Sequence, residues 1–336
     1  MKPKVVLAYS GGLDTSVLVR WLSEAGYRVV AFCADVGQGE DLAPIKQRAF
    51  QCGATQVVIR NLQAPFAKSF VLPALKAGAI YEGQYLLATA LSRPLIAQGL
   101  ADVAKQTGAV AVAHGCTGKG NDQVRLEVSL QILAPKLKIL APVREWELKS
   151  RAEEIAYAKT QGLKLPAKKE TQYSIDQNLW GVSIESGPLE NPWTEAPNSA
   201  YQWTKSPAKA PAKPVVVKID FRRGVPVSLN GKAVPLVTLI QKLNKLGAQH
   251  GVGRSDMIED RLVGIKSREV YEAPAATILH IAHQALEALT LDRETLETKA
   301  ALAQRYARLI YDGLWFTPLK AAIDSFVETT QARVTG

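Results

Sequence analysis

Nine residues near the amino terminus combine glycines, hydroxyls and one carboxylate at a spacing that suits anion binding. The run is Ala8-Tyr9-Ser10-Gly11-Gly12-Leu13-Asp14-Thr15-Ser16. It joins a β-branched segment, 4–8, to a segment with apolar residues at helical spacing, 16–24. Glycines let backbone amides turn inward, and the amides that open a helix attract anions. The pattern predicts a phosphate-binding loop, although it matches neither G-x-x-x-x-G-K-[ST] nor G-x-G-x-x-G. An ordinary strand-to-helix turn is the alternative.

A second polar loop, 114–125, follows a later apolar segment, 109–113. It reads HGCTGKGNDQVR and brings together a hydroxyl, a carboxamide, a carboxylate and a guanidinium, from Thr117, Asn121, Asp122 and Arg125. This set suits an α-amino acid, because a carboxylate binds its ammonium group and Arg or Thr binds its carboxylate. A polar surface loop without a ligand is the alternative.

The segments around both loops alternate between strand and helix patterns. Strands are predicted at 4–8, 29–34, 56–59, 109–113 and 138–141, and helices at 16–24, 42–52, 85–107 and 151–161. This alternation predicts an α/β fold, a doubly wound parallel sheet covered on both faces. Such sheets bind ligands beyond the carboxyl ends of their strands, where both loops would lie. We assign residues 1–166 to this first domain.

The sequence changes character from residue 167. Five prolines lie from Pro192 to Pro214, and the low-complexity run 206–214 predicts an extended loop. A strand is then predicted at 215–221, a hairpin turn at Asn230-Gly231, and helices at 236–245, 277–290 and 293–312. We therefore expect a second domain of the α+β class over 167–336.

Composition restricts the function classes. The 336 residues carry 41 basic and 31 acidic side chains, a net charge of +10. A basic surface can bind nucleic acid, attract small anionic substrates, or simply be solvated. The three cysteines form neither a disulfide framework nor a zinc motif. No apolar run approaches the roughly 18 residues needed to span a bilayer. We expect a cytoplasmic protein without a membrane partner.

Further runs carry a resemblance to a known family. The first loop resembles the pyrophosphate-binding loop S-G-G-x-D-[ST]-[ST] of the ATP pyrophosphatases. Within that group the chain resembles argininosuccinate synthase over its whole length. The runs that carry this resemblance are ADVGQGE at 34–40, YEGQYLL at 81–87, GKGNDQVR at 118–125, SIDQNLWG at 174–181, HGVGRSD at 250–256 and KSREVYE at 266–272.

The resemblance implies a two-step ligation. ATP, helped by Mg²⁺, would adenylate the ureido oxygen of L-citrulline, and L-aspartate would then displace AMP to give argininosuccinate, the penultimate step of arginine biosynthesis. No nucleic acid takes part in this reaction. A tRNA-modifying ATP pyrophosphatase, favoured by the basic charge, and a shortened paralogue that only binds ATP are the alternative functions.

The resemblance also assigns residues to ligands. ATP would be bound by Ala8, Tyr9, Ser10, Gly11, Gly12, Leu13, Asp14, Thr15, Ser16, Ala34 and Gly115. Citrulline would be bound by Tyr85, Thr89, Asn121, Arg125, Ser174, Ser183, Glu259 and Tyr271. Aspartate would be bound by Thr117, Asn121 and Asp122. The expected catalytic residues are Asp14, Ser16 and Asp122, and no side chain is assigned as a dedicated metal ligand, although Asp14 or water could assist Mg²⁺.

The chain departs from the family pattern at several positions. Ala90 stands where the family has a serine that contacts citrulline, and Ser186, Ala275 and Ala276 stand where glycines are common. After Gly336 the family continues with a strand and a long helix that joins the subunits of a homotetramer. We therefore expect a chain with both ligand-binding domains but without the helix that assembles the tetramer.

Overall fold

The computed structural model describes residues 2–148, 150–163 and 172–336. The predicted domain boundary, between residues 166 and 167, lies outside these ranges. The chain divides into two compact units, each with its own sheet and core. Unit 1 comprises Met1–Asp35, Gly39–Leu62 and Arg93–Glu170, and unit 2 comprises Val36–Gln38, Gln63–Ser92 and Thr171–Gly336.

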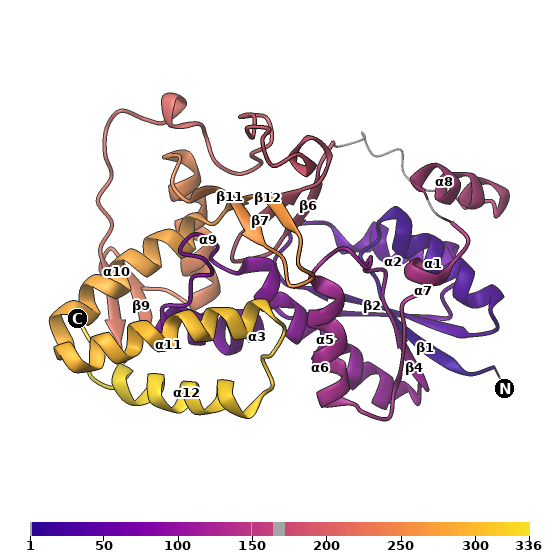
Figure 1. Ribbon diagram of the computed structural model, residues 1–336, viewed down its shortest axis with the longest axis horizontal. Helices are drawn as coiled ribbons and strands as arrows, with labels where there is room; N and C mark the ends of the chain where they lie inside the picture. Colours follow the sequence, from indigo (N-terminus) through magenta and orange to yellow (C-terminus); the bar gives the residue numbers. More distant parts are fainter. Residues whose placement is uncertain (1, 149, 164–171) are drawn as a thin grey trace. The chain divides into compact units, whose positions relative to one another are not determined.

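Unit 1 contains a five-stranded parallel sheet, which confirms the predicted α/β class (Figure 1). The strands lie in the order β3-β2-β1-β4-β5. Their bounds are β1 Lys4–Ala8, β2 Arg28–Asp35, β3 Gln56–Asn61, β4 Ala111–Ala113 and β5 Lys138–Leu140. The central strand β1 pairs with β2 and β4, so its carboxyl end lies between theirs.

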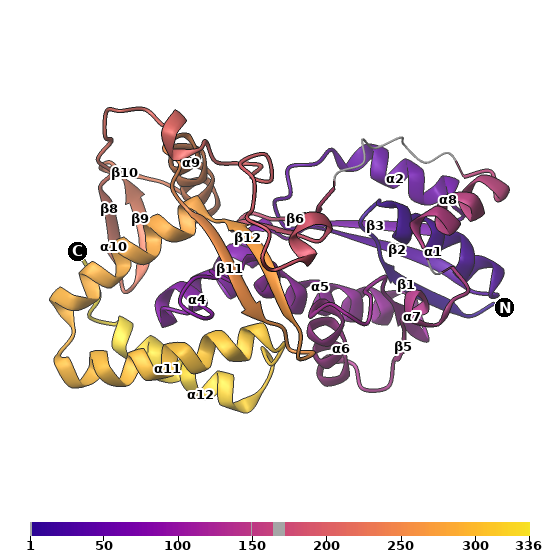
Figure 2. The same cartoon turned by 45° about the horizontal axis from the view of Figure 1, so that its top comes forward.

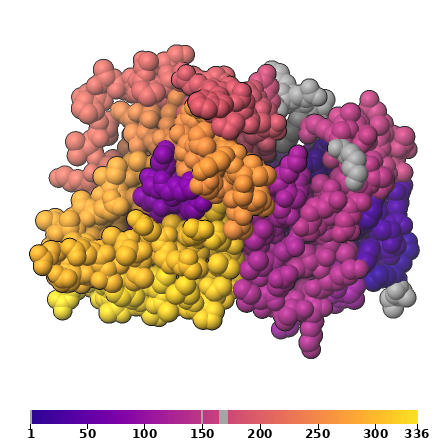
Figure 3. Space-filling model, in the orientation of Figure 1, coloured from indigo at the N-terminus to yellow at the C-terminus, as the bar shows by residue number. Residues whose placement is uncertain are grey.

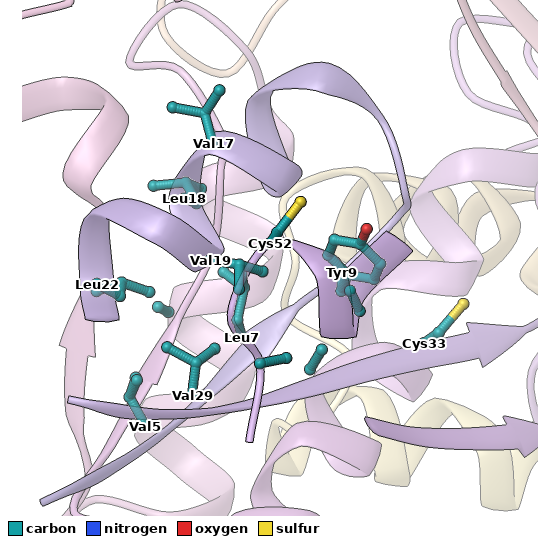
Figure 4. Close-up of a cluster of buried hydrophobic side chains, with 14 of the residues drawn as sticks. Val5, Leu7, Tyr9, Val17, Leu18, Val19, Leu22, Val29, Cys33 and Cys52 are labelled. Carbon is teal, nitrogen blue, oxygen red and sulfur yellow. The ribbon is translucent and has the colours of Figure 1, made fainter. Parts of the chain in front are cut away.

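Helices cover both faces of this sheet (Figure 2). One face carries α1 Leu13–Glu24, α2 Leu42–Gln51 and α8 Arg151–Thr160, and the other carries α5 Ala88–Thr107 and α6 Asp122–Leu133. The short helix α7 is Pro142–Glu145. Successive side chains of β1 point to opposite faces, so Val5 and Leu7 pack against α1 (Figure 4) and Val6 packs against the α5 side. This double burial explains the continuous apolar runs that predicted the strands.

The helix predicted at 85–107 begins three residues later, at Ala88. Leu87 has a positive φ of 64°, and Tyr81 pairs with Tyr85 as an isolated bridge, so the backbone before Ala88 is not helical. Pro94 lies inside the helix, where its missing N–H leaves one carbonyl without an intrahelical donor.

Unit 2 is built on a four-stranded antiparallel sheet that the sequence analysis did not predict. The order is β11-β12-β7-β6, with β6 Ser174–Gln177, β7 Val182–Glu185, β11 Arg254–Asp260 and β12 Lys266–Glu272. One face is apolar and packs Val182, Ile184 and Val270 into a buried cluster. The other face is polar, so these strands lack the apolar run that marked the strands of unit 1.

A second sheet of unit 2 has the order β10-β9-β8, with β8 Ile219–Arg222, β9 Val225–Leu229 and β10 Lys232–Ala233. Asn230 and Gly231 both have positive φ, which confirms the predicted hairpin turn. The strand predicted at 215–221 was wrong in its first half, because β8 begins only at Ile219.

The helices of unit 2 include the three that the sequence predicted. They are α9 Leu236–Gln249, α10 Pro274–Thr290 and α11 Arg293–Tyr311. The structure adds α3 Gln63–Phe66, the π-helix η1 Ala67–Val71, α4 Leu72–Ala77, the short 3₁₀ helices η2 Gly187–Glu190 and η3 Pro207–Lys209, and α12 Pro318–Gln331. In the part of the chain that the structure describes, no helix has the length and apolar character needed to cross a membrane.

The departures from family glycines have different structural consequences. Ala275 and Ala276 lie fully buried in the first turn of α10, where helical backbone accepts alanine. Ser186 has φ 71° and ψ −177°, a region that side chains disfavour. Of these three departures, Ser186, just before η2, is the one that carries backbone strain.

We expect Gly99→Ala to destabilise unit 1. A Cβ at Gly99 would lie 2.4 Å from Cζ of Phe32, which is buried in the sheet. Overpacking costs about 1–3 kcal/mol, and the gain of about 1 kcal/mol in helix propensity offsets part of it. Urea unfolding should show a lower midpoint for Gly99→Ala and an unchanged one for Gln98→Ala, on an exposed position of α5. Equal midpoints for the glycine variant and the parent would contradict this packing.

Candidate active site

The first loop connects β1 to α1 and has the geometry of an anion-binding turn. Gly11 has φ 77°, and Gly12 is the residue before the first turn of α1. A Cβ on Gly11 would lie 3.0 Å from Ile45, so the loop packs closely on α2. The first amides of a helix have no intrahelical acceptors, so those of α1 are available to an anion.

The hydroxyls of this loop divide into two pairs. Ser10 and Thr15 hydrogen-bond to each other at 3.1 Å near the surface. Tyr9 and Ser16 hydrogen-bond at 3.2 Å below it, where both side chains are buried. Burial raises the pKa of Tyr9 to about 12, so its phenol is neutral. Ser10 and Thr15 can therefore reach a ligand, whereas Ser16 supports the loop from underneath.

A guanidinium and a glycine complete the surroundings of the loop. Arg48 of α2 donates a hydrogen bond from Nη1 to the carbonyl of Gly11. Gly115, which follows β4, lies close to α1, because a Cβ there would be 3.1 Å from Leu18 and 3.6 Å from Thr15. Ala34 lies near the carboxyl end of β2 and pairs with β3. The Arg48 guanidinium and the backbone at Gly115 and Ala34 thus lie at one edge of the sheet.

A pair of carboxyl groups lies beside the same loop. Asp14 is exposed in the first turn of α1, and Glu154 is buried on α8. Burial, and then the charge and hydrogen bond of Asp14, raise the pKa of Glu154 to about 8. Within the described ranges, Oε2 of Glu154 is buried and has no hydrogen-bond partner. Burial and the neighbouring Asp14 therefore favour the protonated form of Glu154.

The second loop ends in an arginine–aspartate cluster. Asp122 opens α6, and its two oxygens bind Arg93 Nη2 at 2.7 Å and Arg125 Nη1 at 2.9 Å. Burial alone would raise the pKa of Asp122, but the two guanidiniums lower it to about 2. Its side chain is 28% exposed, so an ionised carboxylate remains accessible.

The rest of the second loop is held by hydrogen bonds. The Cys116 amide donates to Nδ1 of His114 at 3.2 Å, so Nε2 carries the proton and donates to Glu127 at 3.1 Å. Burial lowers the pKa of His114, which keeps the ring neutral. Gln123 donates to the Gly118 carbonyl at 2.7 Å. Thr117 is exposed on this fixed loop, and Asn121 is buried at the start of α6.

In unit 2 the assigned residues share one face of the four-stranded sheet. Ser183 pairs with Tyr271 across β7 and β12, and Ser174 pairs with Glu185 across β6 and β7. Because side chains alternate along a strand, these residues and Glu259 all fall on the polar face, opposite the apolar cluster. Ser174 is exposed at its edge.

Tyrosines pack around Glu259 on this face. Tyr271 donates to Oε2 of Glu259 at 2.6 Å, and Tyr311 donates to Oε1 at 2.5 Å. Tyr85 stacks on Tyr271 with ring centroids 3.9 Å apart, and Tyr81 stacks on Tyr311 at 3.7 Å. In Figure 3 the violet segment around residue 80 is bordered by orange and yellow segments of the same unit. The cluster thus joins three distant parts of the sequence.

The start of α5 is tied to the same face. The Tyr85 hydroxyl accepts hydrogen bonds from the amides of Thr89 and Ala90, at 3.1 and 3.3 Å. The Thr89 hydroxyl lies 2.7 Å from that of Ser183. Ala90 is fully buried. Thr89 therefore supplies a hydroxyl next to the position where the family has its serine.

Sequence reasoning missed several residues of these groups. They are Arg48, Tyr81, Arg93, Glu154 and Tyr311. Arg93 had a usable signal, since it is the only charged residue in the stretch 86–97. Only the contacts in the structure reveal the other four, because each lies on a separate element from the residue that it binds or stacks on.

Comparisons with known proteins point to one enzyme family. A family model for the arginosuccinate synthase N-terminal HUP domain matches residues 4–164, and one for the C-terminal domain of the same enzyme matches 173–336. A protein named argininosuccinate synthase from Pelotomaculum thermopropionicum is 54% identical over 334 residues, 99% of this chain and 83% of that protein. One of the same name from Oceanobacillus iheyensis is 56% identical, over 100% of this chain and 80% of its own length. The chain belongs to the argininosuccinate synthase family.

Membership in the argininosuccinate synthase family confirms the resemblance found in the sequence and makes the chain a carbon–nitrogen ligase. A solved structure, a predicted subunit of a tRNA methyltransferase from Methanocaldococcus jannaschii, has a TM-score of 0.31 and 14% identity over 47% of this chain and 88% of its own. A likeness at that level carries no functional argument.

We expect Glu154→Gln to flatten the pH dependence of stability in unit 1. The folded-state pKa of Glu154, about 8, lies above the unfolded value, so stability is lost as pH rises from about 4.3 toward 8. Gln imitates the protonated carboxyl and removes this loss. Melting curves should show the variant more stable than the parent at pH 9, on the order of 2–4 kcal/mol, and equal to it at pH 4.

The matched control is Glu147→Gln, which alters an exposed carboxylate of the same unit. It should leave the pH profile unchanged. If Glu154→Gln and Glu147→Gln both keep the parent profile, Glu154 is ionised in the folded protein and the assignment is wrong.

Proposed function

We propose that this chain acts as an argininosuccinate synthase, joining L-citrulline to L-aspartate at the expense of ATP. The observation that supports the proposal is that, in each unit, the residues matched to the family lie together and are held in place by hydrogen bonds. Unit 1 presents the phosphate-binding turn and the Arg93–Asp122–Arg125 cluster, and unit 2 presents the polar sheet face around Glu259.

ATP would bind at the first loop of unit 1. The amides of the first turn of α1 would hold phosphate oxygens, helped by the hydroxyls of Ser10 and Thr15. Ala34 and Gly115 would lie against the rest of the nucleotide. We assign Ser16 a positioning role, because its buried hydroxyl binds Tyr9 rather than the loop's open side.

A magnesium ion would fit beside this loop. Mg²⁺ takes one or two carboxylates together with phosphates and water, and Asp14 is an exposed carboxylate in the first turn of α1. Among the residues that the structure describes, no group of three or more His, Cys, Asp or Glu side chains forms a closed metal cage. Asp14 would hold the ion, which would neutralise charge on the pyrophosphate leaving group.

Aspartate would bind at the second loop. The two guanidiniums keep Asp122 ionised, and each carboxylate oxygen retains a lone pair for the substrate ammonium group. Thr117 and Asn121 would bind the substrate carboxylates from the same loop. Because Asp122 touches substrate in this arrangement, it is the residue of this loop that we expect to be catalytic.

Citrulline would bind through its α-amino and ureido groups. The tyrosine hydroxyls fix Glu259, whose oxygens can accept further hydrogen bonds from the substrate ammonium group. Tyr85, Thr89, Ser174 and Ser183 would add neutral contacts. The resemblance assigns Asn121 and Arg125 to citrulline as well, and a guanidinium such as that of Arg125 can bind a carboxylate through two hydrogen bonds.

The reaction needs no protein nucleophile. The citrulline ureido oxygen attacks the α-phosphorus of ATP, the bond to the β-phosphate oxygen breaks, and pyrophosphate leaves. The aspartate amine then attacks the ureido carbon, the C–O bond to AMP breaks, and the amine loses its proton. The protein contributes by positioning the reactants and stabilising charge. We further propose that the reaction takes place in the cytoplasm.

The first test is the substrate dependence of pyrophosphate release. We expect release only when ATP and citrulline are both present, and free AMP only after aspartate is added. Malachite-green detection of phosphate after pyrophosphatase treatment measures the first, and chromatography measures the second. Release stimulated by tRNA and indifferent to citrulline would replace this proposal with the tRNA-modifying alternative.

The second test concerns Asp122. Removing its carboxylate should raise the aspartate KM at least tenfold and more than the citrulline KM, since one charged hydrogen bond contributes about 1.5–3 kcal/mol. Steady-state kinetics of Asp122→Ala measure both constants. The control is Asp102→Ala, on an exposed position of α5, which should leave both unchanged. An unaltered aspartate KM in Asp122→Ala would reject the assignment.

A further inference from the structure

Unit 2 contains a pocket that involves none of the residues assigned to ATP, citrulline or aspartate. It has a volume of about 440 Å³, within the range of small-molecule sites of roughly 300–1,000 Å³. One wall is a stripe of α9, from Gln241 to Gln249. Trp203, Lys205 and Leu179 also line it.

The walls of this pocket are fixed by hydrogen bonds. The carboxylate of Glu272, fully buried, accepts from the amides of Trp203 and Thr204 at 3.0 and 2.7 Å. Asn244 of α9 donates to the Leu179 carbonyl at 2.8 Å. The Lys205 amide donates to the Ala248 carbonyl at 2.9 Å, which also caps the end of α9. A ligand would therefore meet a preorganised surface.

Close packing also shapes the floor. Gly37 has φ 91°, and a Cβ there would lie 2.9 Å from the side chain of Leu179 and 3.0 Å from its amide nitrogen. The Leu179 amide donates to the Val36 carbonyl at 2.9 Å. A side chain at Gly37 would clash with Leu179 and displace it, so the glycine preserves this part of the pocket.

The charge of the pocket is positive. Lys205 and Lys245 both line it and are exposed, and none of its described lining residues is a carboxylate. Among the described residues, neither ammonium group has a hydrogen-bond or ion-pair partner. Two unneutralised cations facing one cavity attract an anion, and phosphate or carboxylate is the matching group.

An aromatic side chain supplies the second recognition element. Trp203 packs against the apolar cluster of unit 2, its indole N–H donates to Gln177 at 3.2 Å, and it also lines the pocket. Indole surface held in this way suits a flat ring. Gln241 and Gln249 are exposed carboxamides that can donate and accept hydrogen bonds to such a ring.

We propose that this pocket is a second ligand site, for a nucleoside phosphate whose phosphate binds Lys205 and Lys245 and whose base packs on Trp203. All of its lining residues belong to unit 2, and none of them is part of the first loop of unit 1. It would let the nucleotide level act on unit 2 without competing with the reacting ATP. The inference does not depend on which substrates the enzyme ligates.

Equilibrium dialysis of the whole chain with labelled AMP tests the site. We expect two AMP molecules per chain, one at the loop of unit 1 and one in this pocket. In the double variant Lys205→Gln/Lys245→Gln, the affinity for AMP at one of the two sites should fall by about tenfold or more, since each charged contact contributes about 1.5–3 kcal/mol. The ATP KM for pyrophosphate release should stay within about twofold of the parent value.

The charge-matched control is Lys209→Gln/Lys242→Gln. Both lysines are exposed, one of them on α9, and neither lines the pocket. This control should keep two AMP sites. Ala248→Phe gives an independent steric test, because it fills the pocket while leaving both lysines in place, and it should also remove one site.

Competition separates the two recognition elements. AMP should displace labelled AMP from the pocket better than adenosine, which lacks the phosphate, and better than inorganic phosphate, which lacks the ring. A single AMP per chain in the parent, or two in both the lysine double variant and Ala248→Phe, would overturn the proposal, and so would phosphate that competes as well as AMP. Two AMP sites without citrulline-dependent pyrophosphate release would leave this inference standing and reject the proposed function.

Discussion

The arrangement of unit 1 depends on the parallel pairing of β1 with β2 and β4. Each of these strands is buried on both faces, so each is held by packing from two directions as well as by backbone hydrogen bonds. Parallel pairing brings the carboxyl ends of all three strands to one edge. The turn after β1, Ala34 of β2 and the second loop after β4 therefore lie at the same edge of the sheet. The strand pairing alone places them there, and no direct bond between them is required.

In unit 2 an antiparallel sheet brings the assigned residues together. One of its faces is apolar and the other is polar. The alternation of side chains puts Val182, Ile184 and Val270 in a core and leaves hydroxyls and carboxylates on the other side. A polar face of this kind would cost free energy if its groups were buried without partners. The bonds from Tyr271 and Tyr311 to Glu259 remove that cost and hold the carboxylate in one orientation.

Charge is distributed differently around the individual carboxyl groups. Asp122 is held ionised by two guanidiniums, whereas Glu154 is held protonated by burial and by its neighbour Asp14. The same functional group, a carboxyl, is thus favoured as an anion in one place and as a neutral acid in another. The net charge of +10 does not reveal this division, because it sums over groups whose environments oppose one another.

The sequence by itself determined the parallel sheet of unit 1, the position of the glycine-rich turn between β1 and α1, and the family. Those features are local, since glycines, β-branched runs and helical periodicity act over a few neighbouring residues. Only the tertiary structure decided that Ser16 points into the core, that Arg93 grips Asp122, and that Tyr311 joins Glu259. It also formed the pocket beside Trp203. These depend on contacts between elements far apart in the chain, and neither spacing nor residue type encodes which distant groups will meet.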